Sequence, residues 1–213
     1  MAEPALILHL VRHGETELNA RRVLQPPATP LSERGLDQAR RLAARLAGEG
    51  IARIVSSDLE RALMTADEVQ RTTGAPLELE PLLQERNFGD LRGRAYAELG
   101  FDPFARDYHP PAGESWEEFE ARADLAWRRV EEIAARSGGP LAVVSHGLVC
   151  RAFALHHLAI NPEARGEEIA SWGNTSLTIA EGPPPWRVHV LNCTAHLRGE
   201  GVDPHGAATR GVA

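Results

Sequence analysis

The stretch LILHLVRHGETELN, residues 6–19, begins as an apolar run and ends in charged and polar residues. Its first part, Leu6–Val11, is typical of a buried strand. A strand with a purely structural role would normally close in a plain turn, whereas this one ends in Arg12, His13 and Gly14 side by side. The end of this strand is therefore the first candidate position for a functional site.

Strands and helices alternate along the rest of the chain. The predicted strands are 6–11, 51–56, 141–145, 175–180 and 187–191, and the Gly-Pro-Pro-Pro stretch at 182–185 separates the last two. The predicted helices are 31–50, a helix behind Ser57, a helix that Ser115 opens, and 147–159. This order favours βαβ units, and hence an α/β fold: a three-layer sandwich with a mostly parallel central sheet flanked by helices.

Two of the predicted helices carry a capping-box signature at their start. Ser57 is followed three residues later by Glu60, and Ser115 is followed by Glu118. We therefore expect each serine to be the N-cap residue of its helix.

The segment of about 81–115 has a different composition. It is rich in glycine, proline, aromatic and charged residues and has little hydrophobic periodicity. We interpret it as a lid-like excursion of loops and short helices that covers the carboxyl edge of the sheet. Residues 1–198 are expected to form a single domain, and the small, polar residues 199–213 to form a disordered tail.

Composition narrows the class of protein. The formal net charge of −7 argues against a general nucleic-acid or anionic-membrane binder, which would need a basic face. The two cysteines, Cys150 and Cys193, form no CxxC motif and are expected to be free thiols in a reducing compartment. No apolar run approaches the length of a membrane span, and the N-terminus lacks the pattern of a secretory signal. We expect a cytoplasmic protein.

Three residues fall where a parallel sheet places its ligands, beyond the carboxyl ends of the strands. His13 follows the first strand, Arg61 lies in the first turn of the helix after the second, and His146 follows the third. Arginine suits phosphate because its planar fork matches two oxygens at once, and a neutral imidazole can act as a nucleophile. Together with Arg12, these residues predict a site for a phosphoryl group.

Four motifs extend this pattern. They are LVRHGETELN (10–19), SSDLERALMTA (56–66), LLQERNFGDLRGR (82–94) and VVSHG (143–147). In this order they resemble the histidine phosphatase superfamily, also called phosphoglycerate mutase-like proteins. The resemblance runs from about Leu8 to His196 and implies the phosphoglycerate mutase-like fold.

The resemblance also implies roles for individual residues. It implies that His13 is the nucleophile that becomes phosphorylated and that Glu85, in the pattern Glu85-x-x-x-Gly89-x-x-x-Gly93, is the proton donor. The residues implied to hold the phosphoryl oxygens are Arg12, Asn19, Arg61, His146 and Gly147. The expected reaction is metal-independent hydrolysis of a phosphomonoester, a small phosphorylated metabolite, through a phosphohistidine and without a cofactor.

The charges of these residues agree with that chemistry. Arg12 and Arg61 should keep His13 neutral, as nucleophilic attack requires. The same arginines should keep Glu85 ionised while the pocket is empty, and an arriving phosphate should favour its protonated form. Two histidines and a carboxylate could also form a metal site, but two arginines in one pocket would repel a cation.

Alternative functions stay open at this stage. A phosphoglycerate mutase would use the same first step, but the compact segment between Glu85 and Ser115, and Leu18 where mutases commonly have Trp, favour the phosphatase branch. The stretches PPAGES (110–115) and NTSLT (174–178) also resemble that branch. Gln25-Pro26-Pro27 departs from the common Gln-Gly and leaves the substrate open.

Two less favoured alternatives are a phosphate-binding regulator and a protein phosphatase. The predicted lid favours a small-molecule substrate over a protein. The oligomeric state is open, with a homodimer as one candidate.

Overall fold

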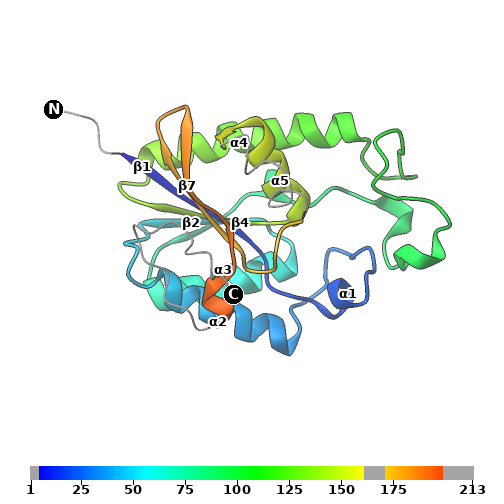
Figure 1. Ribbon diagram of the computed structural model, residues 1–213, viewed down its shortest axis with the longest axis horizontal. Helices are drawn as coiled ribbons and strands as arrows, with labels where there is room; N and C mark the ends of the chain where they lie inside the picture. The colour runs from blue at the N-terminus through cyan, green and yellow to red at the C-terminus, as the bar shows by residue number, and fades with distance from the viewer. Residues whose placement is uncertain (1–4, 161–170, 199–213) are drawn as a thin grey trace, which may run out of the picture.

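The computed structural model describes residues 5–160 and 171–198 (Figure 1). Its strands are β1 Leu6–Arg12, β2 Arg53–Ser56, β3 Leu77–Leu79, β4 Leu141–Ser145, β5 Leu158–Ala159, β6 Leu177–Gly182 and β7 Trp186–Cys193. Its α-helices are α1 Glu17–Ala20, α2 Glu33–Leu46, α3 Glu60–Thr73, α4 Trp116–Arg136 and α5 Gly147–His156. Short 3₁₀ turns are η1 Pro81–Leu83, η2 Gly89–Leu91, η3 Tyr96–Glu98 and η5 Ala195–Leu197. The predicted tail 199–213 lies outside the described residues.

The strands form one seven-stranded sheet in the order β3-β2-β4-β1-β6-β7-β5. Strands β1, β2, β3 and β4 are parallel to one another. Strand β6 runs antiparallel to both of its neighbours, β1 and β7, and β5 is parallel to β7. In the described sheet β6 is thus the strand that runs against the others, and the predicted mostly parallel sheet is confirmed.

Helices cover both faces of the sheet, with α4 and α5 on one face and α2 and α3 on the other (Figure 1). Alternation along β4 explains why both faces are apolar. Leu141 and Val143 join the core under α4 and α5, whereas Ala142 and Val144 join the core under α2 and α3. Since successive side chains of a strand point to opposite faces, a fully apolar strand needs cover on both sides. The predicted three-layer α/β sandwich is confirmed.

Several local predictions need correction. Ser57 is not the N-cap of α3, because Leu59 occupies that position without a side-chain cap and the Ser57 hydroxyl is used elsewhere. Strand β3 was not predicted, because three residues at a sheet edge give too short a pattern to recognise. The helix predicted over 147–159 ends at His156, since Leu158 and Ala159 pair with β7 instead. By contrast, Ser115 and Glu118 form the predicted capping box.

Residues between β3 and α4 form the predicted excursion, which extends beyond the sheet in Figure 1. Arg86 anchors it from inside: the guanidinium donates to the backbone carbonyls of Glu114 and Tyr108, at 3.1 and 2.9 Å, and lies 4.3 Å from the centre of the Trp116 ring. Since Arg86 is only 2% exposed, the loops close around a buried cation whose hydrogen bonds satisfy their carbonyls.

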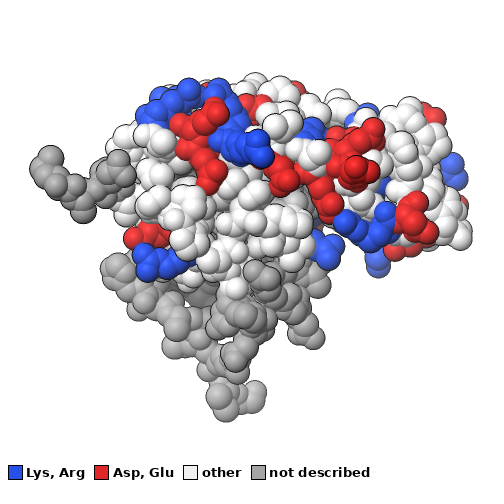
Figure 2. Space-filling view, turned by 90° about the horizontal axis from the view of Figure 1, so that it is seen from above, with Lys and Arg blue, Asp and Glu red and all other residues white. Residues whose placement is uncertain are grey.

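Charges of both signs are interleaved on the face above α4, as Figure 2 shows. Arg129 on this helix pairs with Glu78, Glu80 and Glu132 at 3.0–3.2 Å. Within the described residues, no helix has both the length and the apolar character needed to cross a membrane.

Candidate active site

The ends of β1, β2 and β4 bring the sequence-predicted residues together. These strands are neighbours in the order β2-β4-β1, and Arg12 at the end of β1 lies opposite Ser145 at the end of β4. The chain continues into His13 and His146, whose rings lie 5.1 Å apart between centroids at an angle of 58°. The predicted gathering of these histidines at one sheet edge is confirmed.

One hydrogen bond determines the tautomer of His13. The Nδ1 atom of its ring lies 2.7 Å from the backbone carbonyl oxygen of Gly14. A carbonyl oxygen can only accept, so Nδ1 carries the proton and donates it. In the neutral imidazole the Nε2 atom is then left with a free lone pair, as a nucleophile requires.

His146 is held by a hydroxyl group. Its Nε2 atom lies 2.8 Å from the Oγ atom of Ser57, which also accepts a hydrogen bond from the backbone N–H of Leu59 at 3.3 Å. The buried Nδ1 atom of His146 has no hydrogen-bond partner among the described residues. If Ser57 donates to Nε2, the Nδ1–H of His146 is the group left to bind an anionic oxygen.

Burial and the two arginines lower the pKa of both histidines well below 6.5. For His13 and for His146 the largest cause is burial, followed by the positive charge of Arg61, and Arg12 acts in the same direction. Both rings are therefore neutral at physiological pH. The predicted effect of the arginines on His13 is confirmed, with burial as the larger cause.

Arg12 and Arg61 keep part of their hydrogen-bonding capacity free. Arg12 donates one bond to the carbonyl of Trp172, and Arg61 donates one to the carbonyl of Pro26 at 3.4 Å. The buried Nε atoms of both have no partner among the described residues. Burial lowers the pKa of Arg61 to about 10, so the group stays charged at neutral pH. Two half-used guanidinium groups beside a neutral imidazole suit a phosphoryl group.

Glu85 closes the other side of the site. Its two carboxylate oxygens accept hydrogen bonds from the backbone N–H groups of Arg86 and Leu148, at 3.0 and 3.2 Å. Burial raises the pKa of Glu85, while these bonds, Arg61 and Arg12 lower it without cancelling the rise. The two arginines thus act on Glu85 in the expected direction, but burial has the larger effect on its pKa. A raised pKa suits a proton donor.

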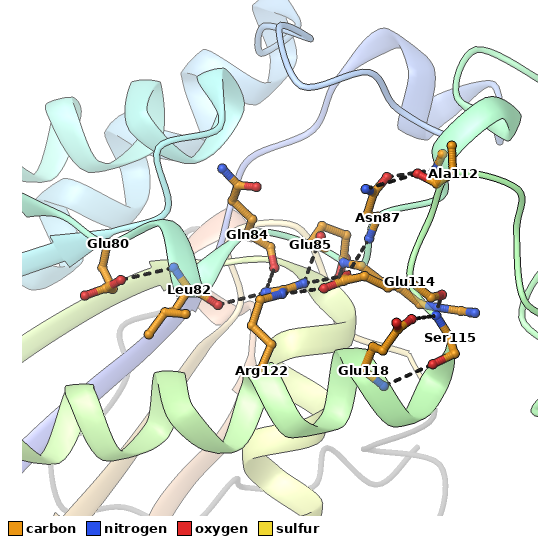
Figure 3. A network of polar contacts seen from close by, with 12 residues as sticks. Glu80, Leu82, Gln84, Glu85, Asn87, Ala112, Glu114, Ser115, Glu118 and Arg122 are labelled. Carbon is orange, nitrogen blue, oxygen red and sulfur yellow. Dashed lines mark hydrogen bonds and ion pairs between the residues drawn. The ribbon is translucent and has the colours of Figure 1, made fainter.

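A network of hydrogen bonds around Arg122 supports the backbone of Glu85 from the side of α4 (Figure 3). Arg122 of α4 donates to the carbonyls of Leu82 and Gln84, both at 2.8 Å, and to that of Glu85 at 3.3 Å. The same guanidinium forms two bonds, of 2.6 and 2.8 Å, to the carboxylate of Glu114. Glu114, which lies in the PPAGES stretch, thus helps to hold the excursion against α4.

A pocket of about 240 Å³ lies over these residues. Of the predicted residues, those that line it are Arg12, His13, Asn19, Arg61, Glu85 and Gly147. The excursion supplies much of the wall, through Arg86, Phe88, Arg92, Tyr96 and Phe104. The prediction that the excursion covers the site is confirmed. The roles of the individual residues stay predictions.

Asn19 and Gly14 have structural surroundings that the sequence did not reveal. The Oδ1 atom of Asn19 accepts a bond of 3.4 Å from Asn174, which also donates to the carbonyl of His13. A Cβ atom at Gly14 would lie 2.6 Å from the carbonyl oxygen of Gly35, so the glycine is needed where α2 packs on the loop.

Several residues of the site escaped sequence reasoning. The sequence predicts Ser57 as a helix cap, whereas its hydroxyl contacts His146. Nothing in the sequence indicates that the carbonyl of Pro26 accepts a bond from Arg61. Trp172 and Arg122 act through backbone carbonyls, which leave no pattern in a sequence. Within residues 5–160 and 171–198, no group of three or more His, Cys, Asp or Glu side chains is arranged to hold a metal ion.

Comparison with known proteins places the chain in a family. A probable phosphoglycerate mutase GpmB of Yersinia pestis (strain Pestoides F) is 32% identical over 209 residues, covering 90% of this chain and 95% of the relative. Among solved structures, a mycobacterial glucosyl-3-phosphoglycerate phosphatase in complex with VO3 has a TM-score of 0.74 and 29% identity, with 87% of this chain and 98% of that one covered. The alpha-ribazole phosphatase of Shigella flexneri has a TM-score of 0.75 and 25% identity, with 92% and 99% covered.

The family model of the histidine phosphatase superfamily (branch 1) matches residues 8–194. That range contains all four motifs and every residue of the pocket. The chain belongs to the histidine phosphatase superfamily.

Proposed function

We propose that this chain is a metal-independent phosphomonoester hydrolase that acts on a small phosphorylated metabolite through a phosphohistidine at His13. The observation that carries the proposal is the hydrogen bond from His13 Nδ1 to the carbonyl of Gly14. It leaves Nε2 unprotonated in a pocket that two arginines, the half-buried Arg12 and the buried Arg61, also line. A fixed neutral nucleophile beside two cations is the arrangement that attack on a phosphate dianion needs.

In the first half-reaction, the Nε2 lone pair of His13 attacks phosphorus. The N–P bond forms while the bond from phosphorus to the ester oxygen breaks, and Glu85 gives its proton to the departing oxygen. Arg12, Arg61 and His146 bind the three other phosphoryl oxygens, whose charge is spread over them in the transition state. The arginines supply the positive charge that a metal ion supplies in other phosphatases.

In the second half-reaction, a water molecule attacks the phosphohistidine. Glu85, now a carboxylate, takes one proton from that water as the new P–O bond forms and the N–P bond breaks. Inorganic phosphate leaves, and His13 and Glu85 return to their starting protonation states. The raised pKa of Glu85 supports both roles. A group whose pKa lies closer to the working pH can both give and take a proton during turnover.

A phosphoglycerate mutase is the second candidate, favoured by the name of the GpmB relative. A mutase returns the phosphoryl group to the intermediate and must keep water away from the phosphohistidine. The phosphatase names of the two solved structures and the compact excursion support the hydrolase. Both candidates share the first half-reaction and separate only at the second.

The test is phosphate release from a panel of phosphomonoesters, including p-nitrophenyl phosphate and 3-phosphoglycerate, in the presence of EDTA. The expected result is release that survives EDTA and is lost in His13→Ala. Interconversion of 2- and 3-phosphoglycerate without release would establish the mutase instead. Release that EDTA abolishes would overturn the metal-independent mechanism.

A further inference from the structure

The pocket contains more positive charge than a phosphoryl group requires. Five of its lining residues are arginines, namely Arg12, Arg61, Arg86, Arg92 and Arg151. Among the described lining residues, Glu85 is the one that carries a carboxylate. The whole chain carries a formal net charge of −7. Such a cluster of positive charges in one pocket of an acidic protein indicates that the ligand is strongly negative.

Three of the five arginines already have a use. Arg12 and Arg61 lie beside the histidines and are assigned to the phosphoryl group. Arg86 donates to three backbone carbonyls of the excursion, those of Pro103, Tyr108 and Glu114. It is also buried against Trp116. Its guanidinium therefore stabilises the loops that form the wall of the pocket.

The remaining two arginines, Arg92 and Arg151, are exposed side chains. Neither side chain forms a hydrogen bond or an ion pair within the described part of the chain, so within the pocket both guanidinium groups are left to bind a ligand. They come from different elements, because Arg92 follows η2 in the excursion and Arg151 lies on α5, and both line the same pocket. The positive charge of Arg92 acts on Arg61, so it stands within electrostatic reach of the phosphoryl site.

We propose that Arg92 and Arg151 form a subsite for a second anionic group of the substrate, either a carboxylate or a second phosphate. The proposal rests on the proposed function, because it takes the phosphoryl group to be bound by Arg12 and Arg61. The substrate is then a phosphomonoester with two separate anionic groups. Aromatic lining residues, among them Tyr96 and Trp172, would contact the uncharged part of such a molecule.

The experiment compares substrates that differ in one anionic group. 3-Phosphoglycerate and glycerol 3-phosphate share a carbon skeleton and differ only in a carboxylate against a hydroxymethyl group. Glucose 1,6-bisphosphate and glucose 6-phosphate differ only in a second phosphate. The quantity to compare is the ratio of kcat/KM within each pair, for the wild type, Arg92→Gln and Arg151→Gln. Arg21→Gln removes the same charge from an exposed site outside the pocket and serves as the matched control.

The wild type should prefer the doubly anionic member of at least one pair, and the pair that responds identifies the second group. Arg92→Gln and Arg151→Gln should each lower that ratio about tenfold, as the loss of one charge-assisted hydrogen bond predicts. Arg21→Gln should leave the ratio as in the wild type. An equal fall for both members of each pair would overturn the subsite, because it would reveal only a general attraction of anions. A ratio that neither variant changes would also overturn it.

Failure of the proposed function gives a different result. If the wild type releases phosphate from none of the four compounds, the same pairs can be compared by calorimetric binding to His13→Ala. Tighter binding of the doubly anionic compound, lost in Arg92→Gln and Arg151→Gln, would support the subsite without hydrolysis. Equal binding of both members would overturn it.

Discussion

The hydrogen bond from His13 Nδ1 to the Gly14 carbonyl ties the chemistry of the site to its backbone. Exchange of its tautomer would move the proton to Nε2 and remove the free lone pair that the proposed attack needs. The loop that supplies this carbonyl is itself fixed, because the N–H of Gly14 donates to Thr65 at 3.1 Å. Thr65 donates in turn to the carbonyl of Arg61 at 2.8 Å. Thr65 therefore links the loop that holds His13 to the helix that carries Arg61.

The pH dependence of turnover should report two groups, His13 and Glu85. Because the pKa of His13 lies well below 6.5, the nucleophile stays neutral in mild acid and kcat should not fall between about pH 7 and 5. Because Glu85 must be protonated to act as an acid and its pKa is raised, kcat should decline as pH rises past that pKa. Glu85→Gln should lower kcat about 10²–10⁴-fold and remove this decline.

The measurement is kcat at saturating substrate against pH, for the wild type and Glu85→Gln. An acidic fall centred near the ordinary histidine pKa would contradict the buried neutral His13. A decline at higher pH that persists in Glu85→Gln would assign it to another group.

Gly35 offers a test of how closely α2 packs on the loop of the nucleophile. A Cβ atom at this position would lie 2.0 Å from the carbonyl oxygen of Glu15. We expect Gly35→Ala to lower the free energy of unfolding by about 1–3 kcal/mol, the cost of overpacking, and to lower kcat because Glu15 follows Gly14. Gly48→Ala is the matched control, since its added Cβ meets no atom within 4 Å. Urea denaturation of both variants measures the effect, and equal stabilities would refute the close contact.

At the scale of elements, the sequence predicts those parts whose pattern is long or whose chemistry is local. The apolar runs of β1 and β4, the amphipathic spacing of α2 and the capping box of Ser115 all lead to the observed elements. Two-residue β5 could not be predicted, because it exists only through its pairing with β7. Ser57 illustrates the same limit, since the hydroxyl that suits a helix cap is used by His146, a residue distant in sequence.

The contact between α4 and the excursion gives a prediction about the position of Glu85. Arg122 should act as a positioning residue, because it holds the backbone of Glu85 without lining the pocket. In the proposed mechanism a displaced Glu85 harms proton transfer in both half-reactions, but only the first of them depends on the leaving group. We therefore expect Arg122→Lys, which cannot keep the two-pronged bond to Glu114, to lower kcat/KM about tenfold or more on an alkyl phosphate. p-Nitrophenyl phosphate, whose leaving group departs readily without a proton, should be affected less.

The measurement is the ratio of kcat/KM on an alkyl phosphate to kcat/KM on p-nitrophenyl phosphate, because kcat/KM reports only the first half-reaction. Arg128→Lys changes an exposed arginine on the same helix and should leave this ratio unaltered. Equal losses on both substrates in Arg122→Lys would indicate a purely structural effect and refute the positioning role.

The whole molecule determines which residues of the site could be predicted. His13, Arg61 and His146 were predictable because the topology of a parallel sheet places strand ends together whatever the intervening sequence. The residues that hold them were not predictable in the same way. Trp172 binds Arg12 from 160 positions away, and it does so through a carbonyl that every residue possesses. A sequence motif identifies side chains, whereas Arg12, Arg61 and His13 are held by hydrogen bonds to backbone carbonyls, which no motif specifies.

Burial of the two catalytic-site histidines has a consequence for the stability of the whole molecule. The pKa of His13 and that of His146 are depressed in the folded state, whereas both should lie near 6.5 in the unfolded chain. Above about pH 6.5 both states are neutral and pH has no effect through these groups. As pH falls below that value, the unfolded chain binds protons that the folded chain does not, so the free energy of unfolding should decrease.

Each of the two histidines should contribute up to about 1.4 kcal/mol per pH unit in the window below pH 6.5. The raised pKa of Glu85 acts in the opposite direction and offsets part of this slope. The lowered pKa values of Glu49 and Glu114 act only at lower pH, so the window between about pH 6.5 and 5 reports histidines. His9, His157 and His196, whose pKa values are also lowered, add to the same slope. Urea denaturation at several pH values in this window gives the slope. His146→Gln should reduce it by one histidine's share, whereas His156→Gln, which changes an exposed side chain, should not. An unchanged slope in His146→Gln would mean that the pKa of His146 is not depressed in the folded protein, which would contradict the neutral pocket on which the proposed attack of His13 depends.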